Sequence, residues 1–212
     1  MALPLISLAG AVLVLGQGGW RRLALLPALA GVALWAAADR PLLLIAADGG
    51  LVGVMGPEGR ALSAARGDGF AAQNWLENDG DLADQKTAAA RPGMAGPEGA
   101  RKFGAGGIMG IALKGRGTTE ALSGACAAAD FVVIAAKVEA GPPDCLLFDT
   151  SRLEAMGALA LYPVEGGKGL RVVSTLRPAR RWSAPARAVA PALIGPARRD
   201  EPLRLAQDGP GQ

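Results

Sequence analysis

The sequence predicts an α+β fold, in which an N-terminal helical hairpin precedes a small mixed sheet with two or three short helices. Short apolar runs recur through the middle of the chain between turn sequences such as Asp48-Gly49, a pattern typical of strands. Between them, longer stretches that begin at Asp, Ser or Thr are typical of capped helices. Hydrophobic residues make up 50% of the chain but aromatic residues only 4%, so we expect a small core.

The first 38 residues consist of two apolar runs of about 15 residues each, separated by a loop that carries Arg21 and Arg22. So few polar residues over this length favour a transmembrane helical hairpin over residues 1–38, with the first helix extended through Trp20 to approach the bilayer thickness of about 30 Å. The two arginines predict a cytoplasmic loop by the positive-inside rule. The domain that follows would then lie in the periplasm, at the bacterial inner membrane.

Two alternatives for this segment remain open. Ala36-Ala37-Ala38 is similar to a signal-peptide cleavage site, although the arginines follow an apolar run and do not open the chain. A buried helical hairpin of a soluble protein is the other alternative, and the scarcity of polar residues is unfavourable to it.

We expect a soluble α+β domain over residues 41–176, beginning with three strands. Residues 42–47, 51–56 and 60–65 are apolar runs joined by Asp48-Gly49 and Pro57-Glu58-Gly59, so they predict a β-meander. A helix over 68–78, capped by Asp68 and ending near Gly80, follows.

Residues 81–107 show no periodicity and predict a long loop. The later elements are expected to be strands alternating with helices and then a closing hairpin. In order they are a strand at 108–113, a helix capped by Thr118 or Thr119, strands at 131–136 and 145–148, a helix at 151–156 capped by Ser151, and hairpin strands at 158–164 and 170–176.

The C-terminal segment, residues 177–212, is rich in Pro, Ala and Arg, which predicts a disordered basic tail. A basic and aromatic cluster opens it: Arg177, Arg180, Arg181 and Trp182. Such a cluster could contact phosphate or nucleic acid. Basic tails are also common without that role, since charge alone gives only nonspecific attraction.

The chain contains no histidine, which removes the most common zinc ligand and every Ser-His or Cys-His pair. Gly110 to Gly115 has the spacing of a phosphate-binding loop, but Arg116-Gly117 stands where Lys and Ser or Thr are required. The dinucleotide pattern at Gly104-Ala105-Gly106 also fails, because Met109 replaces its third glycine. We therefore expect no metal, no cofactor and no enzymatic activity.

Two groups of carboxylates have both a functional and a structural interpretation. Glu77, Asp79, Asp81 and Asp84 surround Gly80, but their spacing does not match a calcium loop, which favours a solvated helix end. Asp130, Asp144 and Asp149 lie beside apolar strands, where active sites of α/β folds collect carboxylates. Capping of the next helix is the favoured role for Asp149.

Cys126 and Cys145 are the only cysteines, 19 positions apart on a predicted helix and at the start of a predicted strand. Neighbouring elements can bring two such residues within the roughly 7 Å that a disulfide allows between α-carbons. Pairing is expected if the domain lies outside the cytoplasm, and two free buried thiols if it does not.

The order of several weak motifs over residues 20–176 resembles the C-terminal end of ComEC-type competence proteins, the inner-membrane channels for bacterial DNA uptake. The residues that carry the resemblance are Ala47–Val54, Gly59–Ser63, Phe70, Trp75-Leu76, Asp79–Asp81, Cys126, Ala129–Val133, Cys145, Phe148-Asp149, Leu153 and Gly157-Ala158. The apolar hairpin before Asp39 is similar to the last two helices of that channel, whereas residues 86–107 do not match.

The resemblance implies a degenerate metallo-β-lactamase-like domain, because complete relatives have a histidine-rich metal site and this chain has none of those histidines. No catalytic residue can therefore be carried over. It also implies a non-catalytic role in DNA uptake, with the remaining segments or subunits of the channel as partners. The alternative from the residues alone is a stand-alone, membrane-anchored periplasmic interaction domain unrelated to DNA.

Overall fold

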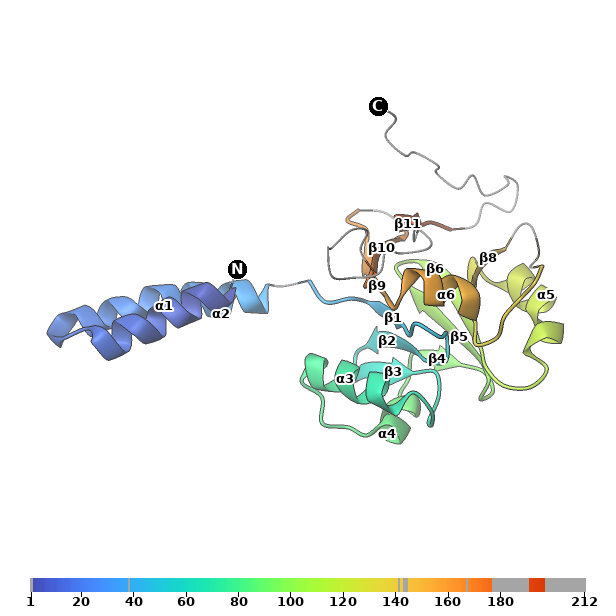
Figure 1. Cartoon of the computed structure of the whole chain (residues 1–212), viewed down its shortest axis with the longest axis horizontal. Helices are drawn as coiled ribbons and strands as arrows, with labels where there is room; N and C mark the ends of the chain where they lie inside the picture. The colour runs from blue at the N-terminus through green and yellow to red at the C-terminus, as the bar shows by residue number, and fades with distance from the viewer. Residues whose placement is uncertain are drawn as a thin grey trace, which may run out of the picture. The chain divides into compact units, whose positions relative to one another are not determined.

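The structure is a computed structural model that describes residues 2–37, 39–140, 142, 145–166, 168–176 and 191–196. The chain divides into two compact units, Met1–Arg40 and Pro41–Gln212. Among the described residues, the first unit is helical and the strands lie in the second (Figure 1).

The N-terminal unit consists of two apolar helices, α1 (Ala2–Leu15) and α2 (Leu25–Ala36), joined by the 3₁₀ helix η1 (Gly18–Ala24). At about 1.5 Å per residue the two α-helices are roughly 21 and 18 Å long, short of the roughly 30 Å of a bilayer core. Across the described residues, no helix combines the length and the hydrophobicity needed to cross a membrane. The prediction of a transmembrane hairpin over residues 1–38 is therefore wrong.

The second unit is an α+β domain with two sheets, where the sequence predicted one. The first sheet is antiparallel, with strand order β11-β10-β9-β1-β2-β3. Its strands are, along the chain, β1 (Leu43–Ile45), β2 (Val52–Gly56), β3 (Gly59–Leu62), β9 (Leu159–Pro163), β10 (Leu170–Ser174) and β11 (Leu193–Ile194). The β1–β2–β3 meander and the β9–β10 hairpin that the turn sequences predict are confirmed.

The second sheet is mixed, with strand order β4-β5-β6-β7-β8. It contains β4 (Met94–Ala95), β5 (Ala100–Ala105), β6 (Ile108–Leu113), β7 (Phe131–Ile134) and β8 (Leu146–Asp149). The strands β6, β7 and β8 are parallel, so their carboxyl ends lie at one edge of the sheet. The helix α5 (Thr118–Ala128) connects β6 to β7, and α6 (Thr150–Met156) follows β8.

The prediction of an irregular loop over residues 81–107 is wrong, because this stretch contains regular structure. It contains the short helix α4 (Gln85–Ala89) and the strands β4 and β5. The sequence does not predict α4, because this helix has only 5 residues, Gln, Lys, Thr and two Ala, of which Ala88 and Ala89 are buried. In β5, alternation of buried and exposed residues is limited to the stretch from Phe103 to Ala105. This stretch is too short to predict a strand.

Helices α3 (Gly69–Asp79) and α4 cover the outer face of the first sheet, and α5 covers that of the second (Figure 1). Between the sheets, strands of both contribute to one apolar cluster. The rings of Phe103, Phe131 and Phe148 lie edge to face at its centre, with centroids 5.7 and 6.2 Å apart. The unit is thus a helix–sheet–sheet–helix sandwich.

The end of the sheet extends beyond the predicted domain boundary at residue 176. Strand β11 pairs with β10 through Leu193 and Ile194, inside the segment predicted as a disordered tail. Residues 177–190 and 197–212 lie outside the described residues, and with them the predicted basic cluster Arg177, Arg180, Arg181 and Trp182.

Candidate functional site

Two carboxylates and one ammonium group meet where the two sheets approach each other, and we call Asp48, Asp68 and Lys114 the lysine-bridged site. Asp48 lies in the turn between β1 and β2, Asp68 directly precedes α3, and Lys114 directly follows β6. Because Lys114 follows β6, the site lies at the sheet edge that holds the carboxyl ends of the parallel strands β6, β7 and β8. Open α/β sheets commonly bind ligands at such an edge.

Lys114 holds the site together. Its Nζ donates to the backbone oxygen of Gly50 at 2.8 Å and to Oδ2 of Asp68 at 2.9 Å. Asp48 accepts a hydrogen bond from the backbone N–H of Gly50 at 2.9 Å, and its own carbonyl accepts from the hydroxyl of Thr150 at 3.0 Å. The ammonium group therefore links the second sheet to a turn of the first and to the start of α3.

The loops around the site leave no room for larger side chains. A Cβ at Gly50 would lie 2.5 Å from Oδ2 of Asp68, and one at Gly67, where φ is +82°, would lie 2.9 Å from Nζ of Lys114. Asp68 itself has a φ of 54°, and its carboxylate makes no capping hydrogen bond to α3. Asp68 therefore occupies the N-cap position as predicted, but its side chain binds Lys114 and does not cap the helix.

The pKa of Asp48 lies below its ordinary value. Burial opposes ionisation of this carboxyl, whereas the hydrogen bond from the backbone N–H of Gly50 and the positive charge of Lys114 favour it. A carboxylate with a lowered folded-state pKa contributes stability that is fully present above its unfolded-state pKa of about 3.9 and is lost as the pH falls through the lowered value.

We therefore expect Asp48→Asn to weaken the acid sensitivity of the fold. The free energy of unfolding of the parent chain should fall as the pH drops below about 5, and the fall should be smaller in the variant, which has one linked carboxylate fewer. Urea denaturation at a series of pH values measures the difference. Glu139→Gln, at an exposed carboxylate, is the matched control. An identical pH profile for Asp48→Asn and the parent would contradict the linkage.

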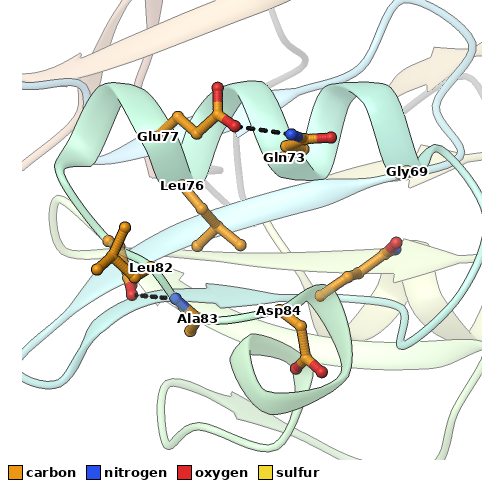
Figure 2. Close-up of a pocket in the computed structure, with 9 residues that line it drawn as sticks. Gly69, Gln73, Leu76, Glu77, Leu82, Ala83 and Asp84 are labelled. Carbon is orange, nitrogen blue, oxygen red and sulfur yellow. Dashed lines mark hydrogen bonds between the residues drawn. The ribbon is translucent and has the colours of Figure 1, made fainter.

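A pocket of about 360 Å³ lies elsewhere, between α3, the turn at residues 81–84 and the start of α4 (Figure 2). Leu76 forms the apolar floor of the pocket and Leu82 an apolar wall. Glu77, Asp81 and Asp84 bring three of the four clustered carboxylates to its lining. In the part of the chain that the structure describes, no group of three or more His, Cys, Asp or Glu side chains is arranged to hold a metal ion.

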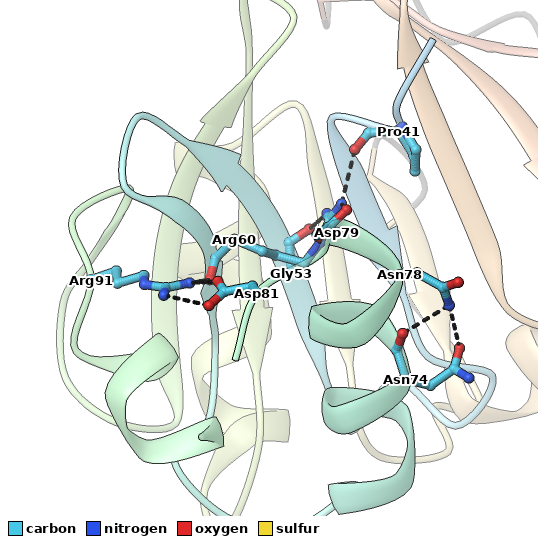
Figure 3. A network of polar contacts seen from close by, with 8 residues as sticks. All are labelled: Pro41, Gly53, Arg60, Asn74, Asn78, Asp79, Asp81 and Arg91. Atoms are coloured by element: carbon cyan, nitrogen blue, oxygen red, sulfur yellow. Dashed lines mark hydrogen bonds and ion pairs between the residues drawn. The ribbon is translucent and has the colours of Figure 1, made fainter. Parts of the chain in front are cut away.

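Two carboxylates of that cluster, Asp79 and Asp81, are in ion pairs, which corrects the prediction of a solvated helix end for these two residues (Figure 3). Asp79 receives hydrogen bonds from the fully buried guanidinium of Arg60, at 2.6 Å from Nε and 3.2 Å from Nη2. Asp81 binds the guanidinium of Arg91, and this pairing lowers the pKa of Asp81 and raises that of Arg91.

The strand-end carboxylates have structural partners. Asp149 caps α6 as predicted, accepting from the backbone N–H of Arg152 at 3.0 Å, so Ser151 is not the cap. Asp130 accepts from the backbone N–H of Met109 at 2.7 Å, which ties the start of β7 to β6. Asp144 lies outside the described residues.

Cys126 and Cys145 form a disulfide, with α-carbons 5.4 Å apart. The bridge fastens α5 to the start of β8, at the edge of the apolar cluster beneath α5. The sequence predicts this pair, but it does not predict the lysine-bridged site. Asp48 has the pattern of a turn residue and Asp68 that of a cap, and a single lysine after a strand carries no spacing signal.

Comparison with protein-family models, with curated proteins and with solved structures finds no match for this chain.

Proposed function

We propose that the unit from Pro41 onward is a non-catalytic periplasmic domain of a ComEC-type DNA-uptake protein, acting with the remaining parts of the channel. The observation that carries the proposal is the disulfide between Cys126 and Cys145, because both cysteines are among the residues on which the resemblance rests. Disulfides persist in oxidising compartments and are rare in the cytosol, which supports a periplasmic location.

The lysine-bridged site supports the non-catalytic part of the proposal. At the sheet edge where a metal or substrate would be expected, the ammonium of Lys114 is the cation bound to Asp68 and to the backbone of Gly50. A fixed ammonium group neutralises carboxylates but supplies no water for hydrolysis. In this proposal, the site joins the two sheets and does not process DNA.

DNA contact is assigned to the arginines of the C-terminal segment. Changing Arg177, Arg180 and Arg181 together to Glu in the full-length chain should weaken binding of a labelled DNA duplex. The plot of log affinity against log salt should become shallower, by about 1 in slope for each of these arginines that binds a phosphate in the parent chain. Arg66→Glu, at an exposed arginine before α3, is the control and should cause a smaller change. Fluorescence anisotropy over a salt series measures both.

The uptake role is tested in the source bacterium. Deletion of the gene should reduce transformation by marker DNA at least a hundredfold. An unchanged frequency, or duplex binding that the triple Arg→Glu variant leaves intact, would contradict the proposal.

A second candidate function is an interaction domain unrelated to DNA. It is favoured by one specific observation, the exposed apolar side chains beside the pocket between α3 and α4. Binding of a protein segment there, with normal DNA uptake in the deletion strain, would select this alternative.

A further inference from the structure

Two unusually exposed apolar side chains lie on α3 and at the pocket between α3 and α4. We call these two side chains, together with the pocket, the α3 surface. In the described part of the second unit, Phe70 and Leu82 are the most exposed large hydrophobic residues, at 87% and 101%. Leu82 lines the pocket. Phe70 precedes Gln73 and Glu77 by three and seven residues, so the three lie along one side of α3, and Gln73 and Glu77 line the pocket.

Single exposed apolar residues need no explanation, but a concave apolar site with such a residue in its lining does. Leu76 forms the buried floor of this pocket, with 2% of its surface exposed. Figure 2 shows Leu76 and Leu82 between the helix α3 and the chain leading to α4. The pocket therefore offers an apolar surface that remains open to solvent.

The rim of the pocket is acidic. Glu77 accepts a hydrogen bond from the amide of Gln73 at 2.7 Å, a neutral donor that leaves the negative charge of the carboxylate in place. Asp84 accepts from the backbone N–H of Thr87 at 2.7 Å, and hydrogen bonds from Thr87 hold its pKa below the ordinary value, so it is ionised. Lys86 is the nearby positive charge that acts on Asp84, and among the described residues that line the pocket there is no lysine or arginine.

We propose that the α3 surface binds a segment of a partner protein in which a lysine or arginine lies next to a large apolar side chain. The methylene stem of the basic residue would pack against Leu76 and Leu82, while its charged end reaches Glu77 and Asp84. The neighbouring apolar residue would cover Phe70. Charge complementarity selects a basic segment over an acidic one, since an acidic segment would meet the carboxylates of Glu77 and Asp84.

The proposal is independent of DNA uptake and is tested by selecting peptides. A library of random 12-residue peptides is panned against the full-length chain, and against a full-length Glu77→Lys variant to remove nonspecific binders. We expect the enriched peptides to share a lysine or arginine beside Leu, Ile or Phe. The dissociation constant of the best labelled peptide, measured by fluorescence anisotropy, should rise at least tenfold in Glu77→Lys and in Leu82→Ser.

Matched controls keep the result specific. Glu154→Lys, at an exposed position of α6, makes the same charge change elsewhere and should leave the dissociation constant within twofold. Equal binding to the parent chain and to Leu82→Ser, enrichment of acidic peptides, or no enrichment would each overturn the proposal. So would tighter peptide binding after Arg198, Arg199 and Arg204 are changed to Glu, because that result identifies the chain's own C-terminal segment as the occupant.

Discussion

Replacing Arg60 by methionine is expected to lower the free energy of unfolding by about 3–5 kcal/mol, the range observed when one partner of a buried ion pair is removed. The guanidinium of Arg60 has no exposed surface, and the Asp79 side chain has only 10%. Methionine fills similar volume but donates no hydrogen bond. The variant therefore loses both bonds to Asp79, together with those to the carbonyls of Gly53 and Pro41 at 3.2 Å each. Urea denaturation of the full-length chain measures the change.

A double change separates charge from packing. Arg60→Met combined with Asp79→Leu removes both partners of the ion pair, so it should recover much of the stability that Arg60→Met alone removes. Arg66→Met, at an exposed arginine, should change the free energy of unfolding by less than about 0.5 kcal/mol. A loss below about 1 kcal/mol for Arg60→Met would contradict the structural role given to this pair.

The Arg60 network explains a feature of the sequence that local patterns do not. Gly53 is in the middle of β2, and a Cβ there would lie 2.8 Å from Cδ of Arg60 and 3.1 Å from Cε3 of Trp75. A glycine inside a strand weakens it, but here it gives the arginine a path to the carboxylate at the end of α3. Figure 3 shows Arg60 reaching across the strand toward Asp79.

Several elements with their own turn or cap signals are predicted correctly, although α4 is missed despite its Asp84 cap. Asp48-Gly49 and Pro57-Glu58-Gly59 define the meander, Gly80 ends α3 in the left-handed conformation, and Asp149 caps α6. The alternation that would reveal β5 is limited to Phe103 and Ala105, and α4 is one turn long, so this part of the fold depends on tertiary packing.

Long-range polar contacts are the other part that the sequence does not reveal. Lys114 contacts Gly50 across 64 positions and Asp68 across 46, and Arg60 contacts Asp79 across 19. No local pattern relates such residues. The prediction for the N-terminal segment fails for a different reason. Its composition is typical of a membrane helix, but α1 and α2 are too short to span a membrane.

Loss of the disulfide is the second large expected effect. The bridge closes a loop between positions 19 apart, for which the chain-entropy estimate is about 3 kcal/mol of stability. For a unit of this size, that loss corresponds to a fall in Tm of roughly 6–12 °C. Cys126→Ser, Cys145→Ser and the double variant should show similar falls, since each removes the same bond. Thermal unfolding followed by circular dichroism measures the shift, and Ser123→Ala, at an exposed position of α5, is the control.

Chemical reduction of the disulfide should lower the Tm as much as the cysteine substitutions do. The parent chain in dithiothreitol should unfold close to the Tm of the double variant, whereas the double variant should not respond to the reductant. The oxidised parent, unfolded in guanidinium, should contain no titratable thiol, and Cys126→Ser should contain one, from Cys145. Because both cysteines lie at the edge of the apolar cluster under α5, the packing contribution of one sulfur is small beside the loop constraint. Two thiols per unfolded parent chain purified from the periplasm would refute the bond, and with it the support that the bond gives to a periplasmic location.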